Sequence, residues 1–180
     1  MPIDVPVVAQ VFLQVFLALL MLAAALPKLR APDEFVGVVR NFRLLPGSLA
    51  TVTGRVLPWM ELALAPALLW SETRVPAAWI TLALMLVFAL AVAINLARGR
   101  REIDCGCLRI SHGKGERISA GLVLRDLVFA AGAWLLTQGA TSAPEAAAVW
   151  VGALFGLLAL LLYLSLDWAT AQLRSLPRAH

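Results

Sequence analysis

The sequence predicts an all-α protein, a polytopic transmembrane helical bundle, and three observations support this prediction. Of the 180 residues, 61% are hydrophobic and 14% are charged. The mean hydropathy is +0.85, and a soluble domain of this length cannot bury so much apolar surface in one core, whereas a bilayer solvates it. The apolar residues also form continuous runs without the period-two alternation of barrel strands. The lipid bilayer is therefore the first expected partner.

A helix needs about 20 residues to cross the hydrocarbon core of a bilayer. Five apolar stretches of the sequence are long enough to do so. We expect a four-helix core and a fifth span. No Lys or Arg precedes the first stretch, which argues against a cleaved signal peptide. The expected spans cover about residues 6–26, 49–70, 76–97, 118–138 and 145–166.

Prolines mark the ends of these stretches. Pro27 and Pro32 follow the first, Pro46 precedes the second, Pro76 opens the third and Pro144 opens the fifth. Proline lacks an amide hydrogen and clashes with the preceding turn, so we expect each to stand where a helix starts or stops.

The segment between Pro32 and Leu45 has a different pattern, in which apolar residues recur at helical spacing among charged ones. The apolar positions are Phe35, Val36, Val39, Phe42 and Leu45. This pattern predicts a short interfacial amphipathic helix after the first span. No repeat, low-complexity tract or linker divides the chain, so we expect residues 1–180 to form a single domain.

Basic residues in the connections predict the orientation of the bundle. The N-terminal tail and the fourth connection carry none and the second carries one, whereas the first, the third and the C-terminal tail carry four, six and two. Positive connections stay in the cytoplasm, so we expect the N-terminus outside a bacterial inner membrane and the third connection inside. These signals account for the net charge of +4 without a nucleic-acid role.

The only two cysteines of the chain stand one glycine apart, in Asp104-Cys105-Gly106-Cys107 of the basic third connection. A thiolate is the nucleophile in disulfide exchange, and the cations Arg101 and Arg109, together with His112 when it is protonated, can favour it. A disulfide closed over so short a loop should be strained and therefore exchange readily. The pattern predicts Cys105 and Cys107 as the catalytic residues of a thiol–disulfide oxidoreductase.

Two other interpretations of the cysteines stay open. With His112 they could supply three ligands to zinc, but a closed structural site takes four and the chain has no second cysteine pair, so no metal is expected. They could also be two thiols of no special function at the edge of a loop.

Ionisable residues inside the predicted spans form a second candidate group, since each is costly in hydrocarbon and normally faces a partner in the bundle. They are Arg55, Glu61, Arg125 and Asp126, with Asn95 as an uncharged polar position. Six residues separate Arg55 from Glu61 and place them on different helix faces, so we expect Glu61 to pair with Arg125 across helices. The pair would either fix helix register or serve a redox or quinone site. Asn95 is expected to form an ordinary interhelical hydrogen bond.

Several short motifs, spread from about residue 10 to 165, together resemble one family of membrane proteins. They are Ala25-Leu26-Pro27-Lys28-Leu29, Leu44-Leu45-Pro46, Leu57-Pro58, Glu61-Leu62, Asn95, Asp104-Cys105-Gly106-Cys107 and Leu124-Arg125-Asp126-Leu127. By these residues the chain resembles MauE, the methylamine-utilisation membrane protein of the DoxX-like group. The resemblance implies a partnership with a thioredoxin-like protein, MauD in the methylamine system, in disulfide formation and maturation of the methylamine dehydrogenase small subunit. Cys105 and Cys107 would be the redox pair, while Lys28, Glu61 and Arg125 match recurring family positions.

The layout also resembles quinone-linked thiol oxidases of the vitamin K epoxide reductase and DsbB type. This resemblance implies a quinone as electron acceptor near the cysteine motif, with Arg125 stabilising a quinone oxygen. In that layout the cysteines face the oxidising compartment, whereas the charge pattern places them in the cytoplasm, which would favour electron import toward a periplasmic thioredoxin-like protein. A non-catalytic membrane scaffold for a maturation partner and a small transporter are the alternative functions.

Overall fold

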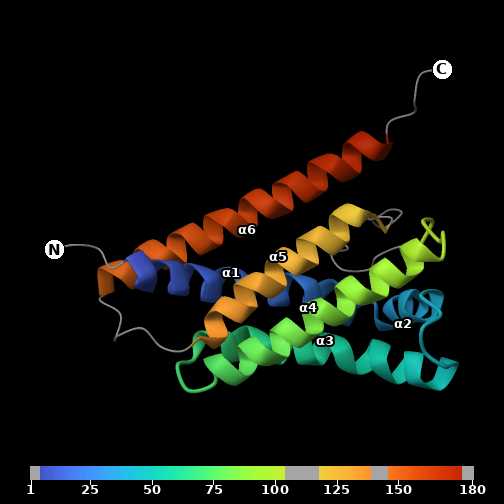
Figure 1. Ribbon diagram of the computed structural model, residues 1–180, viewed down its shortest axis with the longest axis horizontal. Helices are drawn as coiled ribbons and strands as arrows, with labels where there is room; N and C mark the ends of the chain where they lie inside the picture. The colour runs from blue at the N-terminus through green and yellow to red at the C-terminus, as the bar shows by residue number, and fades with distance from the viewer. Residues whose placement is uncertain (1–4, 104–117, 139–145, 176–180) are drawn as a thin grey trace.

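The computed structural model of the chain describes residues 5–103, 118–138 and 146–175, and over these ranges it contains six α-helices and no strand (Figure 1). The all-α prediction is therefore confirmed. The helices are α1 (Val5–Arg30), α2 (Pro32–Asn41), α3 (Gly47–Leu69), α4 (Arg74–Ala97), α5 (Ala120–Thr137) and α6 (Ala146–Ser175).

Each of the five predicted spans corresponds to a helix. By length and composition, α1, α4, α5 and α6 are apolar enough to cross a membrane, which fits a multi-pass membrane protein. The 23 residues of α3 are not among these four. This helix contains Arg55 and Glu61 together with Pro58 and Pro66, and these residues lower its hydropathy.

The long helices alternate in direction, as the predicted spans require. In Figure 1, α1, α4 and α6 run from left to right, and α3 and α5 return from right to left. The C-terminal ends of α1 and α4 therefore lie at the same end of the bundle, where α2 also lies. The short connection between α3 and α4 lies at the opposite end.

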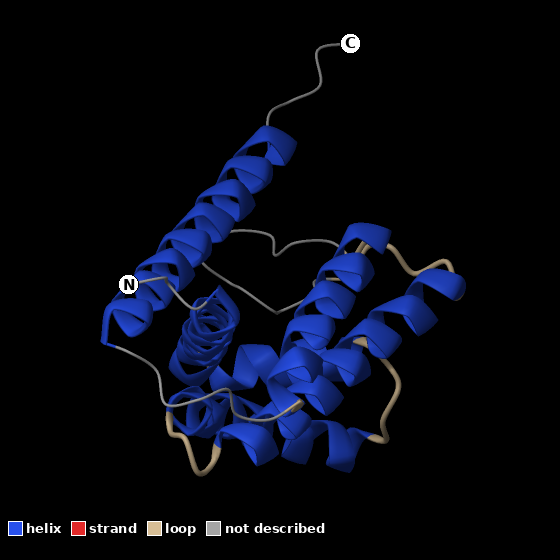
Figure 2. Cartoon of the chain, turned by 60° about the vertical axis from the view of Figure 1, so that its left-hand side comes forward, coloured by secondary structure: helices blue, strands red, loops and turns tan. Residues whose placement is uncertain are grey.

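Helix α1 lies at the centre and packs against α3, α5 and α6. Its residues Leu17 and Met21 are almost fully buried in the main core, together with Leu68 of α3 and Leu136 of α5. Neither α3 and α5 nor α5 and α6 have Cα atoms within 8 Å of each other. In Figure 2, the C-terminal part of α6, the helix that leads to the C-terminus, extends beyond the other helices. The order of packing around α1 therefore decides which side chains can meet.

Two glycines allow α6 to approach α1 closely. A Cβ atom added at Gly152 would lie 2.8 Å from Cβ of Val11 and 2.9 Å from the carbonyl oxygen of Val8. At Gly156 it would lie 3.0 Å from the carbonyl oxygen of Phe12. The two glycines stand four residues apart, the small-residue spacing typical of close helix pairs in membranes. This spacing is a sequence signal for the contact that the pattern of spans alone does not show.

The predicted amphipathic helix is confirmed as α2, which is shorter than expected. It packs against α3 and buries Phe35, Val36 and Val38. A Cβ atom at Gly54 of α3 would lie 2.9 Å from Cα of Val36, so this contact also depends on a glycine. The helix ends at Asn41 because Arg43 adopts the left-handed region, with φ of 50°, which a continuing α-helix cannot accommodate.

The expected stop at Pro27 is wrong. Helix α1 continues through Pro27 to Arg30, and the amide of Ala31 donates to the carbonyl of Pro27 over 3.2 Å. The added turn carries Lys28 into the bundle, where an ion pair with Glu61 holds it. Pro32, Pro46 and Pro76 do stand at or before a first helical turn, as expected, and Pro144 lies outside the described residues.

Candidate functional site

The two predicted catalytic residues, Cys105 and Cys107, lie outside the described residues, as do Arg109 and His112 of the same connection. The structure does describe where this connection begins and ends. The amide of Ile118 donates to the carbonyl of Ile103 over 3.0 Å, and both side chains are buried against Val92 and Leu122. The cysteine segment therefore leaves and rejoins the bundle at one point, between the C-terminus of α4 and the N-terminus of α5.

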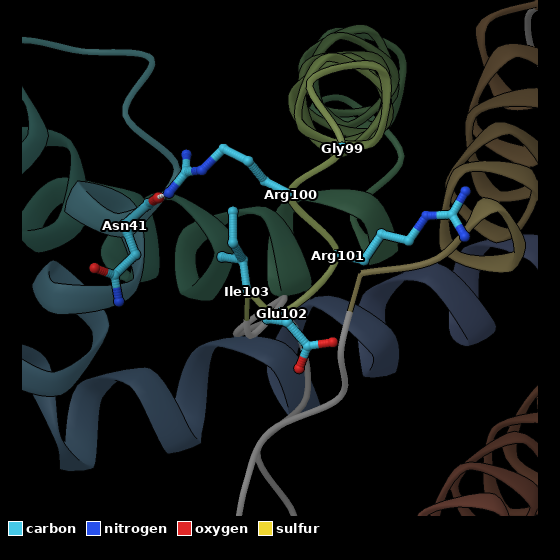
Figure 3. Close-up of a pocket in the computed structure, with 6 residues that line it drawn as sticks. All are labelled: Asn41, Gly99, Arg100, Arg101, Glu102 and Ile103. Atoms are coloured by element: carbon cyan, nitrogen blue, oxygen red, sulfur yellow. Dashed lines mark hydrogen bonds between the residues drawn. The ribbon is translucent and has the colours of Figure 1, made fainter.

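Arg100, at the start of the cysteine connection, forms hydrogen bonds with the C-terminal end of α2. Its guanidinium donates to Oδ1 of Asn95 (2.9 Å), to the carbonyl of Asn41 (2.7 Å) and to the carbonyl of Phe42 (3.2 Å). Figure 3 shows Arg100 pointing toward Asn41 while Arg101 points the opposite way. The preceding Gly99 has φ of 73°, a left-handed conformation that glycine adopts without strain.

A cavity of about 400 Å³ lies beside this network (Figure 3). Its described lining residues are Asn41, Gly99, Arg100, Arg101, Glu102 and Ile103. Two arginines and one carboxylate thus stand immediately before the cysteine motif in the chain. Cationic groups near a thiol favour the thiolate, so this surrounding is compatible with exchange chemistry.

The expected interhelical hydrogen bond of Asn95 is not what the structure shows. Nδ2 of this fully buried side chain donates to the carbonyl of Ala91, one turn earlier in α4, over 3.1 Å. Its oxygen accepts from Arg100, which follows α4. Asn95 therefore reaches α2 only through Arg100, and its role is to orient that arginine.

We expect Arg100→Ala to lower the free energy of unfolding by about 1.5–3 kcal/mol, the range for hydrogen bonds that involve a charged group. Hydrogen exchange of the backbone amides at residues 40–43 should accelerate, because the carbonyls at the end of α2 lose their donor. Arg98→Ala is the matched control, since Arg98 is exposed and makes only a 3.4 Å hydrogen bond to Arg43. Equal exchange at the end of α2 in both variants would contradict this role for Arg100.

The predicted pair of Glu61 and Arg125 is wrong, because Glu61 pairs with Lys28. The ammonium of Lys28 donates to both carboxylate oxygens of Glu61, at 2.5 and 2.7 Å. Lys28 is 3% exposed and Glu61 is fully buried. The physical reason is the packing order, since α1 lies between α3 and α5 and brings its own lysine to Glu61 first.

Arg125 instead forms hydrogen bonds with Asp126, the next residue in the chain, and with Tyr163 of α6. Its Nε and Nη2 donate to Oδ1 of Asp126 over 2.9 and 2.8 Å, and its Nη1 donates to the hydroxyl of Tyr163 in α6 over 3.2 Å. Asp126 is buried, with 2% exposed. The ring of Tyr163 also packs edge-on against Phe129 with 5.6 Å between centroids. Arg125 therefore links α5 to α6.

Arg55 does not lie in the interior of the bundle. Its side chain is 66% exposed and stands 3.7 Å from the exposed carboxylate of Asp33 in α2. An exposed pair of this kind contributes little to stability. Among the described residues, no group of three His, Cys, Asp or Glu side chains gathers to hold a metal ion.

Comparison with known proteins gives one family. The family model described as methylamine utilisation protein MauE matches residues 6–139. Proteins named methylamine utilization protein MauE are similar to the chain in several organisms. The protein of Paracoccus denitrificans is 49% identical over 155 residues, which cover 85% of this chain and 82% of the relative.

Two further relatives give similar values. The Methylorubrum extorquens protein is 45% identical over 160 residues, covering 87% of this chain and 84% of the relative. The Methylophilus methylotrophus protein is 49% identical over 125 residues, covering 69% and 65%. No solved structure matches the chain.

Proposed function

The chain belongs to the MauE family of methylamine utilisation proteins, and from this premise we propose that it is a membrane thiol–disulfide redox protein of methylamine utilisation. The observation that carries the proposal is the pair Cys105 and Cys107, the only cysteines of the chain, in a connection whose two ends are held together between α4 and α5. Two cysteines in a connection whose ends are anchored at one point suit exchange with a partner better than they suit a structural disulfide that stabilises the fold.

The proposed chemistry is disulfide exchange with a thioredoxin-like partner, a MauD-like protein. A partner thiolate attacks the disulfide between Cys105 and Cys107, forming a mixed disulfide and releasing one thiolate of the pair. The second partner thiol displaces the other cysteine, so that the partner leaves oxidised and the pair is reduced by two electrons. The oxidised partner would then support disulfide formation in a maturing protein such as the small subunit of methylamine dehydrogenase.

Reoxidation of the pair needs an acceptor, and we propose a membrane quinone. When bound, a quinone supplies a two-electron, two-proton acceptor. Arg125 is one candidate to contact a quinone oxygen, although its guanidinium already bonds Asp126 and Tyr163, and a quinone would have to compete with these acceptors.

We place the protein in a bacterial inner membrane, with the cysteine connection at the cytoplasmic end. The concentration of Lys and Arg at the α2 end of the bundle supports this orientation. The partner oxidation described above applies, with this orientation, to a partner reached from the cytoplasm and, with the opposite orientation, to periplasmic thiols. Electron transfer from the cytoplasm to a periplasmic thioredoxin-like protein is the alternative direction, in which the partner oxidises the pair.

The test combines function with sidedness. We expect Cys105→Ser and Cys107→Ser each to abolish maturation of the client disulfide protein while the partner still co-purifies, since docking does not need the thiols. A bulky membrane-impermeant maleimide, applied to spheroplasts before and after lysis with and without reduction, reports which side carries the pair. Full maturation in the Cys105→Ser/Cys107→Ser protein would favour the alternative, a non-catalytic scaffold.

Two sentinel variants calibrate the labelling. Ser48 lies in the first turn of α3, next to the connection from α2, and Ser71 lies in the connection between α3 and α4 at the other end of the bundle; both are exposed. In the cysteine-free background, Ser48→Cys and Ser71→Cys should label from opposite sides of the membrane. The native pair should follow Ser48→Cys, and labelling together with Ser71→Cys would overturn the cytoplasmic placement.

A further inference from the structure

An apolar cavity of about 280 Å³ lies between α2, α3 and α4, with Lys28 in its wall. Aromatic and aliphatic side chains form most of the lining, including Phe35, Val39, Phe42, Leu57, Phe88 and Ala91. Val87 and Leu90 also line it and are 61% and 60% exposed. The cavity therefore reaches the outer surface of α4, a helix apolar enough to face hydrocarbon.

Two hydrogen-bond donors stand in this apolar lining. The Lys28 ammonium has three hydrogens, and the carboxylate of Glu61 supplies acceptors for two of them. Its nitrogen lies 5.0 and 5.6 Å from the ring centroids of Phe35 and Phe88. Thr53 also lines the cavity, and its hydroxyl makes no hydrogen bond within the described part of the chain.

The charge of the site selects between ligands. Lys28 and Glu61 together are neutral, so a carboxylate or phosphate would bring an uncompensated negative charge into an apolar cavity, which is costly. A neutral carbonyl oxygen accepts a hydrogen bond from Lys28 or Thr53 without that cost. The volume lies near the lower limit of small-molecule pockets, about 300 Å³, so it takes one ring system or a short length of chain.

We propose that this cavity binds the carbonyl-bearing part of an apolar molecule that enters from the bilayer beside Val87 and Leu90. The carbonyl oxygen accepts hydrogen bonds from Lys28 and Thr53, and the rings of Phe35 and Phe88 contact the apolar body. A membrane quinone and the ester region of a lipid acyl chain share this chemistry. The quinone case rests on the proposed redox function, whereas the site itself does not.

The test is photoaffinity labelling of the full chain in nanodiscs, with an azido-benzoquinone carrying a prenyl tail and, separately, a diazirine-bearing phosphatidylcholine. Mass spectrometry of the labelled peptides locates each probe. We expect labelling in α2 and α4, and at least a tenfold loss in Ala91→Phe, which fills the cavity and leaves both residues of the ion pair unsubstituted. Ala83→Phe is the matched control, because Ala83 is exposed on the same helix and does not line the cavity.

Three further variants test the hydrogen bond of Thr53 and provide a second way to fill the cavity. Thr53→Val should weaken binding about two- to tenfold, as loss of one hydrogen bond predicts. Thr81→Val should not, since Thr81 is fully buried outside the cavity. If Ala91→Phe does not give a monodisperse helical protein, Val39→Trp fills the same space from α2.

The two sources give different results. Labelling by the quinone probe that depends on Ala91 identifies a quinone site, and the same dependence with only the lipid probe identifies an acyl-carbonyl site. Labelling that Ala91→Phe and Val39→Trp both leave unchanged, or no labelling of α2 and α4, overturns the proposal. The same measurement on Cys105→Ser/Cys107→Ser separates the two proposals, because binding should persist there even if thiol exchange is not the function.

Discussion

Glu61→Gln is expected to lower the free energy of unfolding by about 3–5 kcal/mol, the cost of removing one partner of a buried ion pair. The substitution keeps the shape of the side chain and removes its charge. Lys28, which is 3% exposed, would then hold an ammonium among Phe35, Phe88 and other apolar groups without a counter-charge. Unfolding in detergent micelles by titration with a denaturing detergent, followed by helical circular dichroism, measures the loss.

The double variant Lys28→Met/Glu61→Met separates lost charge from lost packing. With both charges removed, no unpaired charge remains, so we expect it to be more stable than Glu61→Gln and close to the native protein. Glu72→Gln is the matched control, since Glu72 is an exposed acid in the turn between α3 and α4. A double variant that loses the sum of the losses of Lys28→Met and Glu61→Met would show no energetic coupling between the two residues and would contradict the pairing.

Gly152→Leu is expected to separate α6 from α1. The new side chain would meet the Val8 carbonyl at 2.9 Å and Val11 at 2.8 Å, and a backbone carbonyl cannot move aside as a flexible side chain can. Overpacking that side chains can absorb costs about 1–3 kcal/mol, so a backbone clash should cost about 3 kcal/mol or more. Because α1 is the only described helix whose backbone packs against α6, only side-chain contacts such as those of Tyr163 with Arg125 and Phe129 would still hold α6 to the bundle.

In Gly152→Leu, the displacement of α6 should break the hydrogen bond between Arg125 and Tyr163 and lower the free energy of unfolding. Phe129, packed against Tyr163, should become more accessible, and limited proteolysis should release α6 before the other helices. Gly121→Leu is the control, because a Cβ there meets only Oγ of Ser119 at 3.6 Å. It should stay within about 0.5 kcal/mol of the native protein. Equal losses at Gly121 and Gly152 would refute the close approach of α6.

The positions of the polar residues show where sequence reasoning reaches its limit. Glu61 was correctly expected to be buried and paired across helices, since an isolated charge in hydrocarbon is too costly. Its partner was not predictable, because Lys28 stands after a proline that normally ends a helix. Only the continuation of α1 through Pro27 brings that lysine inside.

By itself the sequence determined the all-helical class, the approximate ends of the spans, the alternation of their direction and the amphipathic α2. These features depend on local hydropathy, turn residues and loop charge. Such properties determine how each segment interacts with the bilayer and with water, and they do not depend on which helix packs beside it. The tertiary structure decided the pairing of Lys28 with Glu61, the link from Arg125 to Tyr163, the cavity beside Lys28 and the close contact at Gly152. Each of these depends on which helices are neighbours, and a bilayer accepts many helix orders at similar hydrophobic cost, so side-chain packing around α1 selects among them.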